Sequence, residues 1–332
     1  MSSIAKLSGR DKTNALRTHI VSMLAADSFI SGEIIAIELG ITRSSVSNHI
    51  KALSALGLDI FSVKGRGYKL AEKLTLLDES RIRAYLFAEH DARILVNNIV
   101  GSTNDSLRTQ SLGLPQGSVC LAEAQTNGRG RRGRKWVSPF GASIYMSMVW
   151  RFEGGYQSLA GLSLLVGIGV NRALKRIGIV DCRLKWPNDV YHHGKKLAGI
   201  LIEVEGQSGE PATAVIGIGV NIQLPASVDG IDQPYTDVSS ILSRAVDRNE
   251  FVARLLEELW LMLPQFQLNG LSTFMQQWKD ADLYYGQAIS LTSGKNISTG
   301  ISKGIDINGA LLLETNGHLK AYHGGEISVR PA

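Results

Sequence analysis

The sequence predicts a multidomain α+β protein with a helical N-terminal domain, a larger domain around a mixed α/β layer, and a small C-terminal β-barrel. Helical hydrophobic periodicity marks the first part of the chain. From about Leu74, strand-like and helical stretches alternate. Short strand-like segments separated by Gly or Asn make up the last part. We place the three domains at residues 1–73, 74–283 and 284–332.

Composition is that of an ordinary globular protein. The chain has 332 residues, of which 44% are hydrophobic and 20% charged, enough for cores in two or three domains. The net charge of +5 favours partners that carry phosphates, although many basic proteins bind none. The charge therefore permits nucleic-acid or nucleotide binding without establishing either.

The two cysteines and the apolar runs bear on location. Cys120 and Cys182 share no local spacing, which excludes a Cys-rich zinc site and argues against a disulfide framework. The polar, basic start of the chain does not read as a secretory signal. The longest apolar run, Leu162–Val170, is about half the ~20 residues that a membrane helix needs. We expect a cytoplasmic protein without a membrane partner.

Three helices are predicted in the N-terminal domain. Residues 16–25 place apolar side chains on one face, Ser31 opens a second helix that Gly40 ends, and Thr42 caps a third that Gly57 closes. Val46, Ile50, Leu53 and Leu56 repeat at helical spacing in the third helix and should face the core. The polar side of that helix carries side chains suited to base edges and phosphates: Arg43, Ser44, Ser47, Asn48 and Lys51.

A basic β-hairpin follows. In Asp59–Leu70, strand-like runs flank a Gly-containing turn whose tip carries Lys64 and Arg66. Helices followed by a basic hairpin are typical of a winged helix-turn-helix that binds DNA. A small helical domain that mediates protein contacts is the alternative.

Alternating elements define the rest of the chain. The central strands are expected at Ile94–Val100, Ser118–Glu123, Ile144–Val149 and Ala214–Ile222, with helices at Ser158–Gly178 and Arg248–Leu268. The C-terminal strands are expected at Ala288–Leu291, Ser298–Ile307, Ala310–Glu314 and Leu319–Tyr322. Asn-Gly pairs between several of the latter indicate hairpins.

A loop rich in glycine and arginine, GRGRRGR at residues 128–134, is the first candidate for a ligand site. Glycines allow close approach, and arginines present charged forks that suit phosphate and carboxylate. The loop lacks the Gly-Lys-Ser/Thr ending of a P-loop, and its arginines do not suit a dinucleotide turn. A solvated basic loop or a nonspecific nucleic-acid patch is the alternative when the loop is taken alone.

Neighbouring motifs make the loop specific. GSTN at 101–104, KWPND at 185–189, KLAGI at 196–200 (with a preceding Lys) and GIGVN at 217–221 follow a fixed order around it. With the winged helix and the terminal GGEISVR, nearly the whole chain resembles the bacterial family of bifunctional biotin–carboxylase ligases and biotin operon repressors. The resemblance implies a class II synthetase-like central domain and an SH3-like C-terminal barrel.

The resemblance also implies a two-step reaction. Biotin and MgATP give biotinoyl-5'-AMP and pyrophosphate, and a carrier lysine then attacks the mixed anhydride. Cations must offset the repulsion when a carboxylate meets the α-phosphate. Arg131 and Lys196 match the family's catalytic positions, and Arg129 is expected to help them. Asp189 is either a metal ligand or a residue that holds a loop, and we favour the loop; the metal ligands stay undetermined.

Binding residues are carried over by motif. Those matching the biotin site are Ser102, Thr103, Asn104, Gln125, Gly128, Arg129, Gly130, Arg131, Lys196 and Gly199. Those matching the nucleotide site are Arg129, Arg131, Arg134, Asn188, Asn221, Tyr235 and Arg330. Turn capping is the alternative for Ser102 and Asn104, and a solvated terminal strand for Arg330. Tyr235 lies in a loop, residues 223–240, where the family carries a tryptophan that stacks on adenine.

The implied partners are a biotin carrier domain of acetyl-CoA carboxylase and operator DNA. Biotinoyl-5'-AMP would act as corepressor, and the adenylate-bound protein would form a homodimer that matches a two-fold operator. Three alternatives stay open at this stage. They are a ligase for lipoate or a related acid, a ligase whose winged helix no longer represses, and a purely regulatory DNA-binding protein.

Overall fold

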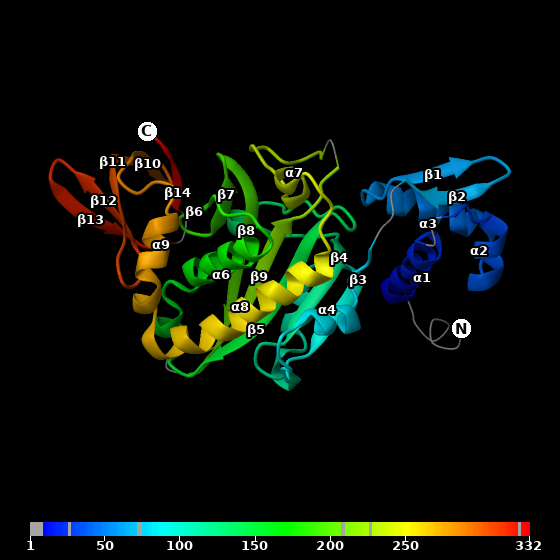
Figure 1. Ribbon diagram of the computed structural model, residues 1–332, viewed down its shortest axis with the longest axis horizontal. Coiled ribbons are helices and arrows are strands. Elements are labelled where there is room, and N and C mark those ends of the chain that lie inside the picture. Colours follow the sequence, from blue (N-terminus) through cyan, green and yellow to red (C-terminus); the bar gives the residue numbers. More distant parts are fainter. Residues whose placement is uncertain (1–8, 26–27, 72–74, 207–209, 226–227, 325–326) are drawn as a thin grey trace.

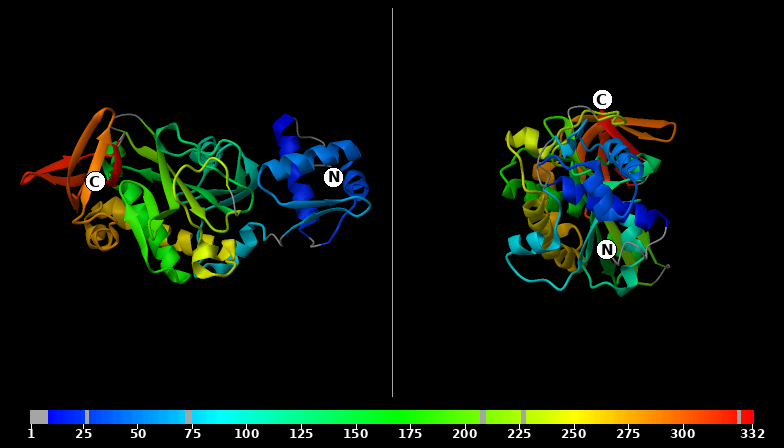
Figure 2. Two further views of the ribbon diagram at one scale, coloured as in Figure 1. Left: turned by 90° about the horizontal axis from the view of Figure 1, so that it is seen from above. Right: turned by 90° about the vertical axis from the view of Figure 1, so that its right-hand side faces the viewer.

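The computed structural model describes residues 9–25, 28–71, 75–206, 210–225, 228–324 and 327–332. Three units follow one another along the long axis of the molecule, from the N-terminal helices through a central sheet to a C-terminal β unit (Figure 1). The views in Figure 2 confirm this linear arrangement. The predicted boundary between residues 73 and 74 falls outside the described residues.

The N-terminal unit is a winged helix-turn-helix. It consists of α1 (Gly9–Leu24), α2 (Gly32–Leu39), α3 (Arg43–Ala55), β1 (Ile60–Val63) and β2 (Gly67–Leu70). The predicted caps are present: the Ser31 hydroxyl accepts from the Ile34 amide, and the Thr42 hydroxyl accepts from the Ser45 amide. Gly40 ends α2 at a φ of 63°, a conformation that glycine adopts without strain. α1 begins at Gly9, earlier than the predicted start at residue 16. The prediction missed these first turns because they carry no apolar periodicity.

The two sides of α3 divide as the periodicity predicts. Val46, Ile50 and Leu53 are buried against α1 and α2. The polar residues face outward: Arg43, Ser44, Asn48 and Lys51 are exposed and Ser47 is half-buried. The wing tip places Lys64 and Arg66 in solvent, and the Arg66 guanidinium lies 4.3 Å from the centre of the Phe29 ring. Helix face and wing together present cations without a covering layer.

The central unit is built on a seven-stranded mixed sheet. Its strands are β3 (Ile94–Val100), β4 (Val119–Gln125), β5 (Ser143–Phe152), β6 (Cys182–Lys185), β7 (Asp189–His192), β8 (Lys195–Glu205) and β9 (Ala212–Asn221). The spatial order is β3-β4-β5-β9-β8-β7-β6. Only the β3–β4 pair is parallel; the other pairs are antiparallel. The predicted mixed sheet is therefore confirmed.

Helices cover one face of this sheet. The long helices are α6 (Leu162–Arg176) and α8 (Arg248–Asn269), and the shorter ones are α4 (Glu79–Tyr85), α7 (Val238–Leu242) and α9 (Met275–Ala281). Alternate strand residues such as Ile144, Met146 and Ile216 pack with them in one apolar core. α5 (Thr103–Arg108) lies on the opposite face, where Leu107 contacts Val149 and Val215. In the described part of the chain, no helix is long and apolar enough to cross a membrane.

The C-terminal unit is a five-stranded antiparallel sheet. It contains β10 (Ala288–Ser293), β11 (Asn296–Ile305), β12 (Leu311–Thr315), β13 (His318–Tyr322) and β14 (Ile327–Pro331), in the order β13-β12-β11-β10-β14. The register of β11 against β12 shifts between Ser302 and Ile305, which bends the sheet. The Trp186 indole donates to the Gly309 carbonyl at 2.9 Å, so the central KWPND motif is tied to this unit.

A buried ion pair fixes the entry of the chain into the central unit. Glu123 of β4 and Arg248 of α8 pair at 2.6 Å, with side-chain exposures of 0% and 6%. The Glu123 carboxylate also accepts from the Leu77 amide at 2.6 Å, and the Arg248 guanidinium donates to the Thr75 carbonyl at 2.8 Å. The segment that follows the winged helix is thus held by both charged groups.

We predict that Arg248→Met lowers the free energy of unfolding by about 3–5 kcal/mol, because it leaves the Glu123 carboxylate buried without its partner. Arg81→Met is the matched control, since the Arg81–Asp247 pair is much more exposed, with side-chain exposures of 49% and 23%. The control should cost less than about 1 kcal/mol. Chemical denaturation of the central unit measures both variants, and equal losses would contradict the role of the buried pair.

Candidate functional site

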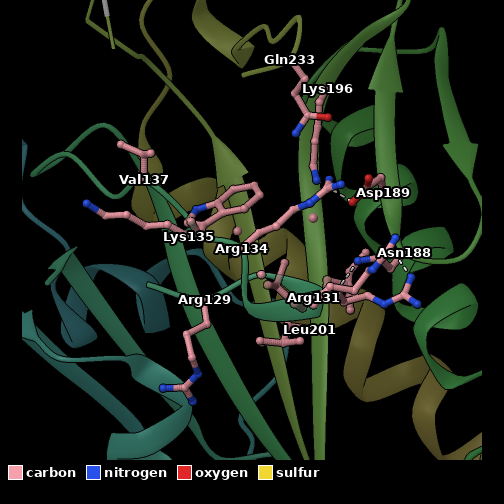
Figure 3. A pocket seen from close by; sticks show the side chains of 18 of the residues that line it. Arg129, Arg131, Arg134, Lys135, Val137, Asn188, Asp189, Lys196, Leu201 and Gln233 are labelled. Atoms are coloured by element: carbon pink, nitrogen blue, oxygen red, sulfur yellow. Dashed lines mark hydrogen bonds and ion pairs between the residues drawn. The ribbon is translucent and has the colours of Figure 1, made fainter. Parts of the chain in front are cut away.

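A pocket of about 550 Å³ opens on the sheet face that the long helices leave uncovered. Most of the motif residues identified in the sequence line it: Ser102, Thr103, Asn104, Gln125, Arg129, Gly130, Arg131, Arg134, Asn188, Lys196, Gly199, Asn221 and Tyr235. They come from α5 and its N-cap, the end of β4, the glycine-arginine loop, the turn before β7, strands β8 and β9, and the loop at residues 223–240. Figure 3 shows Arg131, Asn188 and Lys196 among the side chains around this pocket. Segments separated by more than a hundred residues therefore meet in one cavity.

The floor of the pocket is made of backbone. Gly199 of β8 pairs with Gly219 of β9, and Gly217 lies two residues before Gly219 on the same face. A Cβ built on Gly219 would stand 2.5 Å from the Trp136 ring, and one built on Gly199 would stand 2.8 Å from it. A Cβ on Gly217 would stand 2.5 Å from the Asn104 amide oxygen. Glycine at these positions lets Trp136 and Asn104 lie directly on the sheet.

Lys196 and Asp189 form an ion pair inside the pocket. The ammonium lies 2.8 Å from the carboxylate, and the two side chains are 15% and 17% exposed (Figure 3). The ammonium also lies 5.4 Å from the centre of the Trp136 ring. The sequence left two roles open for Asp189, metal ligand or loop support. The structure adds a third, because the Asp189 carboxylate holds the Lys196 ammonium in place.

Arg131 is held by an amide. Its guanidinium donates to the Asn188 side-chain oxygen at 3.1 Å, and the Asn188 amide in turn donates to the Ile200 carbonyl at 2.8 Å. Burial lowers the pKa of Arg131, while Asp189 opposes that shift. The guanidinium lines the pocket, where its fork of N–H donors suits an anion.

Arg129 does not join these two cations. Its guanidinium makes two bonds to Asp105, at 2.6 and 2.8 Å, and reaches the Glu203 carboxylate at 3.1 Å. The bond to Asp105 and the Glu203 carboxylate raise the pKa of Arg129. In Figure 3 the side chain points away from Lys196. Arg129 therefore lies with two carboxylates and apart from Lys196, and the expectation that it helps Arg131 and Lys196 stays a prediction.

A polar cluster lines the end of the pocket beside α5. Gln125 accepts from the Thr103 amide at 2.9 Å and donates to the Ser138 hydroxyl at 3.2 Å. Ser102 occupies the N-cap position of α5, yet its hydroxyl makes no capping bond. Asn104 lies within the helix and donates to the Glu203 carboxylate at 2.8 Å. Turn capping therefore does not explain Ser102 or Asn104.

Further cations gather at the opposite end. Lys185 lines the pocket, and burial is the main cause that lowers its pKa, with Lys196, Arg330 and Arg134 acting in the same direction. Arg330 is exposed on β14 and does not line the pocket itself, but it is near enough to act on Lys185. Lys185 was not assigned a role from the sequence, although it opens the KWPND motif.

The second loop docks on Lys196 through its backbone. The Lys196 amide donates to the Pro234 carbonyl at 2.9 Å, and the Thr236 amide donates to the Lys196 carbonyl at 3.0 Å. This places Tyr235 in the pocket wall. The Asn221 amide donates to the Thr236 carbonyl at 3.0 Å, so Asn221 supports this loop. Residues 226–227 of the loop lie outside the described part of the chain.

Gly128 and Trp136 set the base of the glycine-arginine loop. The Trp136 amide donates to the Gly128 carbonyl at 2.9 Å, and a side chain at Gly128 would overlap the Trp136 backbone. Gly128 acts on the pocket through this turn and does not line it. Among the described residues, no group of three or more His, Cys, Asp or Glu side chains could hold a metal ion.

Three family models match the chain. They are an HTH domain at residues 16–69, the Biotin/lipoate A/B protein ligase family at residues 97–221, and the Biotin protein ligase C terminal domain at residues 284–330. A biotin protein ligase from Aquifex aeolicus, solved in complex with biotin and ATP, aligns with a TM-score of 0.64 and 30% identity, covering 72% of this chain and 99% of that one. Fold and site together define a ligase of the biotin/lipoate class joined to a DNA-binding domain.

Two relatives match nearly the full length. The bifunctional ligase/repressor BirA of Salmonella typhimurium is 41% identical over 94% of this chain and 97% of its own, and BirA of Escherichia coli is 39% identical over 97% and 99%. The chain belongs to the family of bifunctional biotin ligases and repressors.

We predict that Gly219→Ala lowers the free energy of unfolding by about 1–3 kcal/mol, because the added methyl group overlaps the Trp136 ring. The same change in a Trp136→Ala background should cost little, since the ring is gone. Gly113→Ala is the control, because nothing lies within 4 Å of its Cβ position. Thermal unfolding of the four variants gives the comparison, and an additive loss in the double variant would refute direct packing of the ring on the floor.

Proposed function

We propose that the protein activates biotin with ATP to biotinoyl-5'-AMP and then transfers biotin to one lysine of a biotin carrier domain of acetyl-CoA carboxylase. One observation carries the proposal. A single pocket places a hydrogen-bonding cluster for a polar ring at one end, and Arg131 and Lys196 beyond it. The biotin protein ligase from Aquifex aeolicus was solved in complex with biotin and ATP, which supports the same two ligands here.

The first step joins two anions. A biotin carboxylate oxygen attacks the α-phosphorus of ATP, a P–O bond forms, and the bond to pyrophosphate breaks. Arg131 and Lys196 stabilise the negative charge that builds on the phosphoryl oxygens. Lys196 leaves Asp189 and turns to the phosphate, since its ammonium is a mobile point charge. Arg134, Lys185 and Arg330 hold the departing pyrophosphate at the mouth.

The second step consumes the mixed anhydride. The carrier lysine attacks the acyl carbon as a neutral amine, an amide bond forms, AMP leaves, and the amine proton passes to solvent. Arg131 and Lys196 now stabilise the charge on the departing phosphate. Tyr235 supplies an aromatic face for adenine, and Asn188 and Asn221 hold the segments around it. The glycine-arginine loop and the loop that carries Tyr235 would cover the adenylate and keep water from the anhydride.

Magnesium would enter with the nucleotide. Mg²⁺ prefers oxygen ligands and commonly combines substrate phosphates with one or two carboxylates. Asp189 and Asp232 line the pocket and fit that donor set. The ion would neutralise part of the triphosphate charge.

The winged helix would make the enzyme a repressor of biotin synthesis genes, with biotinoyl-5'-AMP as corepressor. Each chain carries a single recognition helix, so a homodimer of the adenylate-bound form would match a two-fold operator. Both cysteines are free and buried, which fits the reducing cytoplasm where operator DNA and carrier protein are found.

We predict that incubation with biotin, MgATP and an apo carrier domain adds the mass of one biotinoyl group to one carrier lysine. Lys196→Ala and Arg131→Ala should reduce the rate by about a hundredfold or more, because each removes a charge from the transition state. Intact mass of the carrier over time is the measurement.

Lys195→Ala is the matched control, since this neighbouring lysine is exposed and lies outside the pocket lining. It should leave the rate unchanged. Transfer of lipoate in place of biotin would change the substrate while keeping the chemistry. Absence of transfer with any acid would overturn the proposed activity.

We predict that Lys51→Ala and Lys64→Ala each weaken binding to operator DNA and reduce the salt dependence by about one unit of slope, because each loses one phosphate contact. Fluorescence anisotropy at several salt concentrations gives the slopes. Lys279→Ala serves as control because Lys279 is exposed in the central unit, where its ammonium lies over Tyr285. Equal effects from all three lysines would mean that binding depends on the net charge of the protein and not on contacts made by the winged helix.

A further inference from the structure

A chain of hydrogen bonds runs behind the polar end of the pocket, from Glu203 through Asn104 and Ser147 to Thr103. The Asn104 amide nitrogen donates to Glu203 at 2.8 Å, and the Ser147 hydroxyl oxygen lies 2.5 Å from the Asn104 amide oxygen. The same hydroxyl lies 2.7 Å from the Thr103 hydroxyl. Ser147 is fully buried on β5, and neither Ser147 nor Glu203 lines the pocket. These two residues therefore act on a ligand through the lining residues that they bind: Ser147 through Asn104 and Thr103, and Glu203 through Asn104 and Arg129.

Glu203 decides which way round the Asn104 amide lies. A carboxylate accepts hydrogen bonds and, when ionised, donates none. Arg129 donates to both oxygens of Glu203 at 3.1 Å, so both of these oxygens act as acceptors. A reversed Asn104 would place its oxygen against the Glu203 oxygen without a proton between them. The amide nitrogen must face Glu203, and the amide oxygen must face Ser147.

The direction of the next bonds follows from counting protons. A contact of 2.5 Å between the Ser147 and Asn104 oxygens requires a proton, which only the Ser147 hydroxyl can supply. A serine hydroxyl has one proton, so Ser147 must accept from Thr103. The Thr103 proton then points away from the pocket. The Thr103 hydroxyl also lies 3.2 Å from the Gln125 side-chain oxygen, but its one proton goes to the shorter contact with Ser147 at 2.7 Å. Gln125 keeps its bond from the Thr103 backbone amide at 2.9 Å.

We propose that Glu203 and Ser147 are positioning residues that fix the hydrogen-bond polarity of the pocket, so that Thr103 offers its hydroxyl oxygen as an acceptor to an N–H group of the ligand. The inference rests on the proposed function, in which the cyclic urea of biotin supplies that N–H. A ring with an oxygen in place of this N–H would meet oxygen against oxygen and be rejected.

The test compares biotin with its two cyclic carbamate analogues, in which one or the other ring N–H is replaced by oxygen. Dissociation constants from calorimetry give a selectivity ratio for each protein. In Glu203→Gln the new amide can donate as well as accept, so the whole chain can reverse and Thr103 can donate to a ring oxygen. Ser147→Ala removes the shorter contact of the Thr103 hydroxyl, so that its proton keeps the longer one to Gln125 at 3.2 Å or turns to a ring oxygen of the ligand. The selectivity ratio is the dissociation constant of an analogue divided by that of biotin. Both variants should lower this ratio about tenfold for one of the two analogues, which is the effect of one hydrogen bond.

Asp105→Asn is the matched control. Asp105 binds the same Arg129 guanidinium but makes no bond to Asn104. This variant should keep the wild-type ratio. Thermal unfolding of all three variants shows that each is folded before ligands are compared.

The outcomes separate two failures. A loss of affinity that is equal for biotin and both analogues would mean that Glu203 and Ser147 only support the fold, which overturns the inference and leaves the proposed function intact. A reduced ratio in Asp105→Asn as well would assign the effect to Arg129. No binding of biotin by the wild-type protein would overturn the proposed function, and the inference with it.

Discussion

The pocket depends on one electrostatic constraint, that cations kept partly out of water must each be held by a partner until an anion arrives. Lys196 has Asp189, Arg131 has Asn188, and Arg129 has Asp105 and Glu203. These partners belong to different segments, and none of them neighbours its cation in sequence. The charged pocket therefore exists only once the sheet, α5 and the glycine-arginine loop have come together.

The sheet separates stability from chemistry by its two faces. Successive strand residues point to opposite sides, so β8 and β9 give Ile200, Ile216 and Ile218 to the helix layer while Gly199 and Gly219 form the pocket floor. The helix layer covers the apolar face, while the glycines of the other face leave room for the Trp136 ring to lie on the sheet. A methyl group on the floor would exclude that ring, whereas the interface with the helix layer is filled mainly by large apolar side chains.

Local patterns in the sequence anticipated much of this. Caps and periodicity defined α2 and α3, Ile94–Val100 is β3 itself, and Asn-Gly pairs marked C-terminal hairpins. The motifs that the sequence analysis grouped together line one pocket in the structure. The sequence did not reveal the partners of Arg129, because Asp105 and Glu203 lie far from it along the chain and a pairing across a sheet leaves no local signal. The buried Glu123–Arg248 pair escaped notice for the same reason. Whether each pocket residue binds the ligand assigned to it stays a prediction.

One short segment, Trp136 to Phe140, connects the pocket to the DNA-binding unit, and most of its residues are held by a hydrogen bond or a packing contact. Trp136 packs on the pocket floor, the Ser138 hydroxyl accepts from Gln125, and the Pro139 carbonyl accepts from a buried tyrosine hydroxyl at 2.8 Å. The next residue, Phe140, donates its amide to the Leu56 carbonyl at 2.7 Å and packs its ring in the core of the N-terminal unit. Only three residues lie between Trp136 on the floor and Phe140 in the other core, and the four steps from one to the other span at most ~14 Å. Because nearly every one of them carries its own bond or packing contact, this segment has little slack, and a displacement of Trp136 must either be passed to the end of α3 or break one of these contacts.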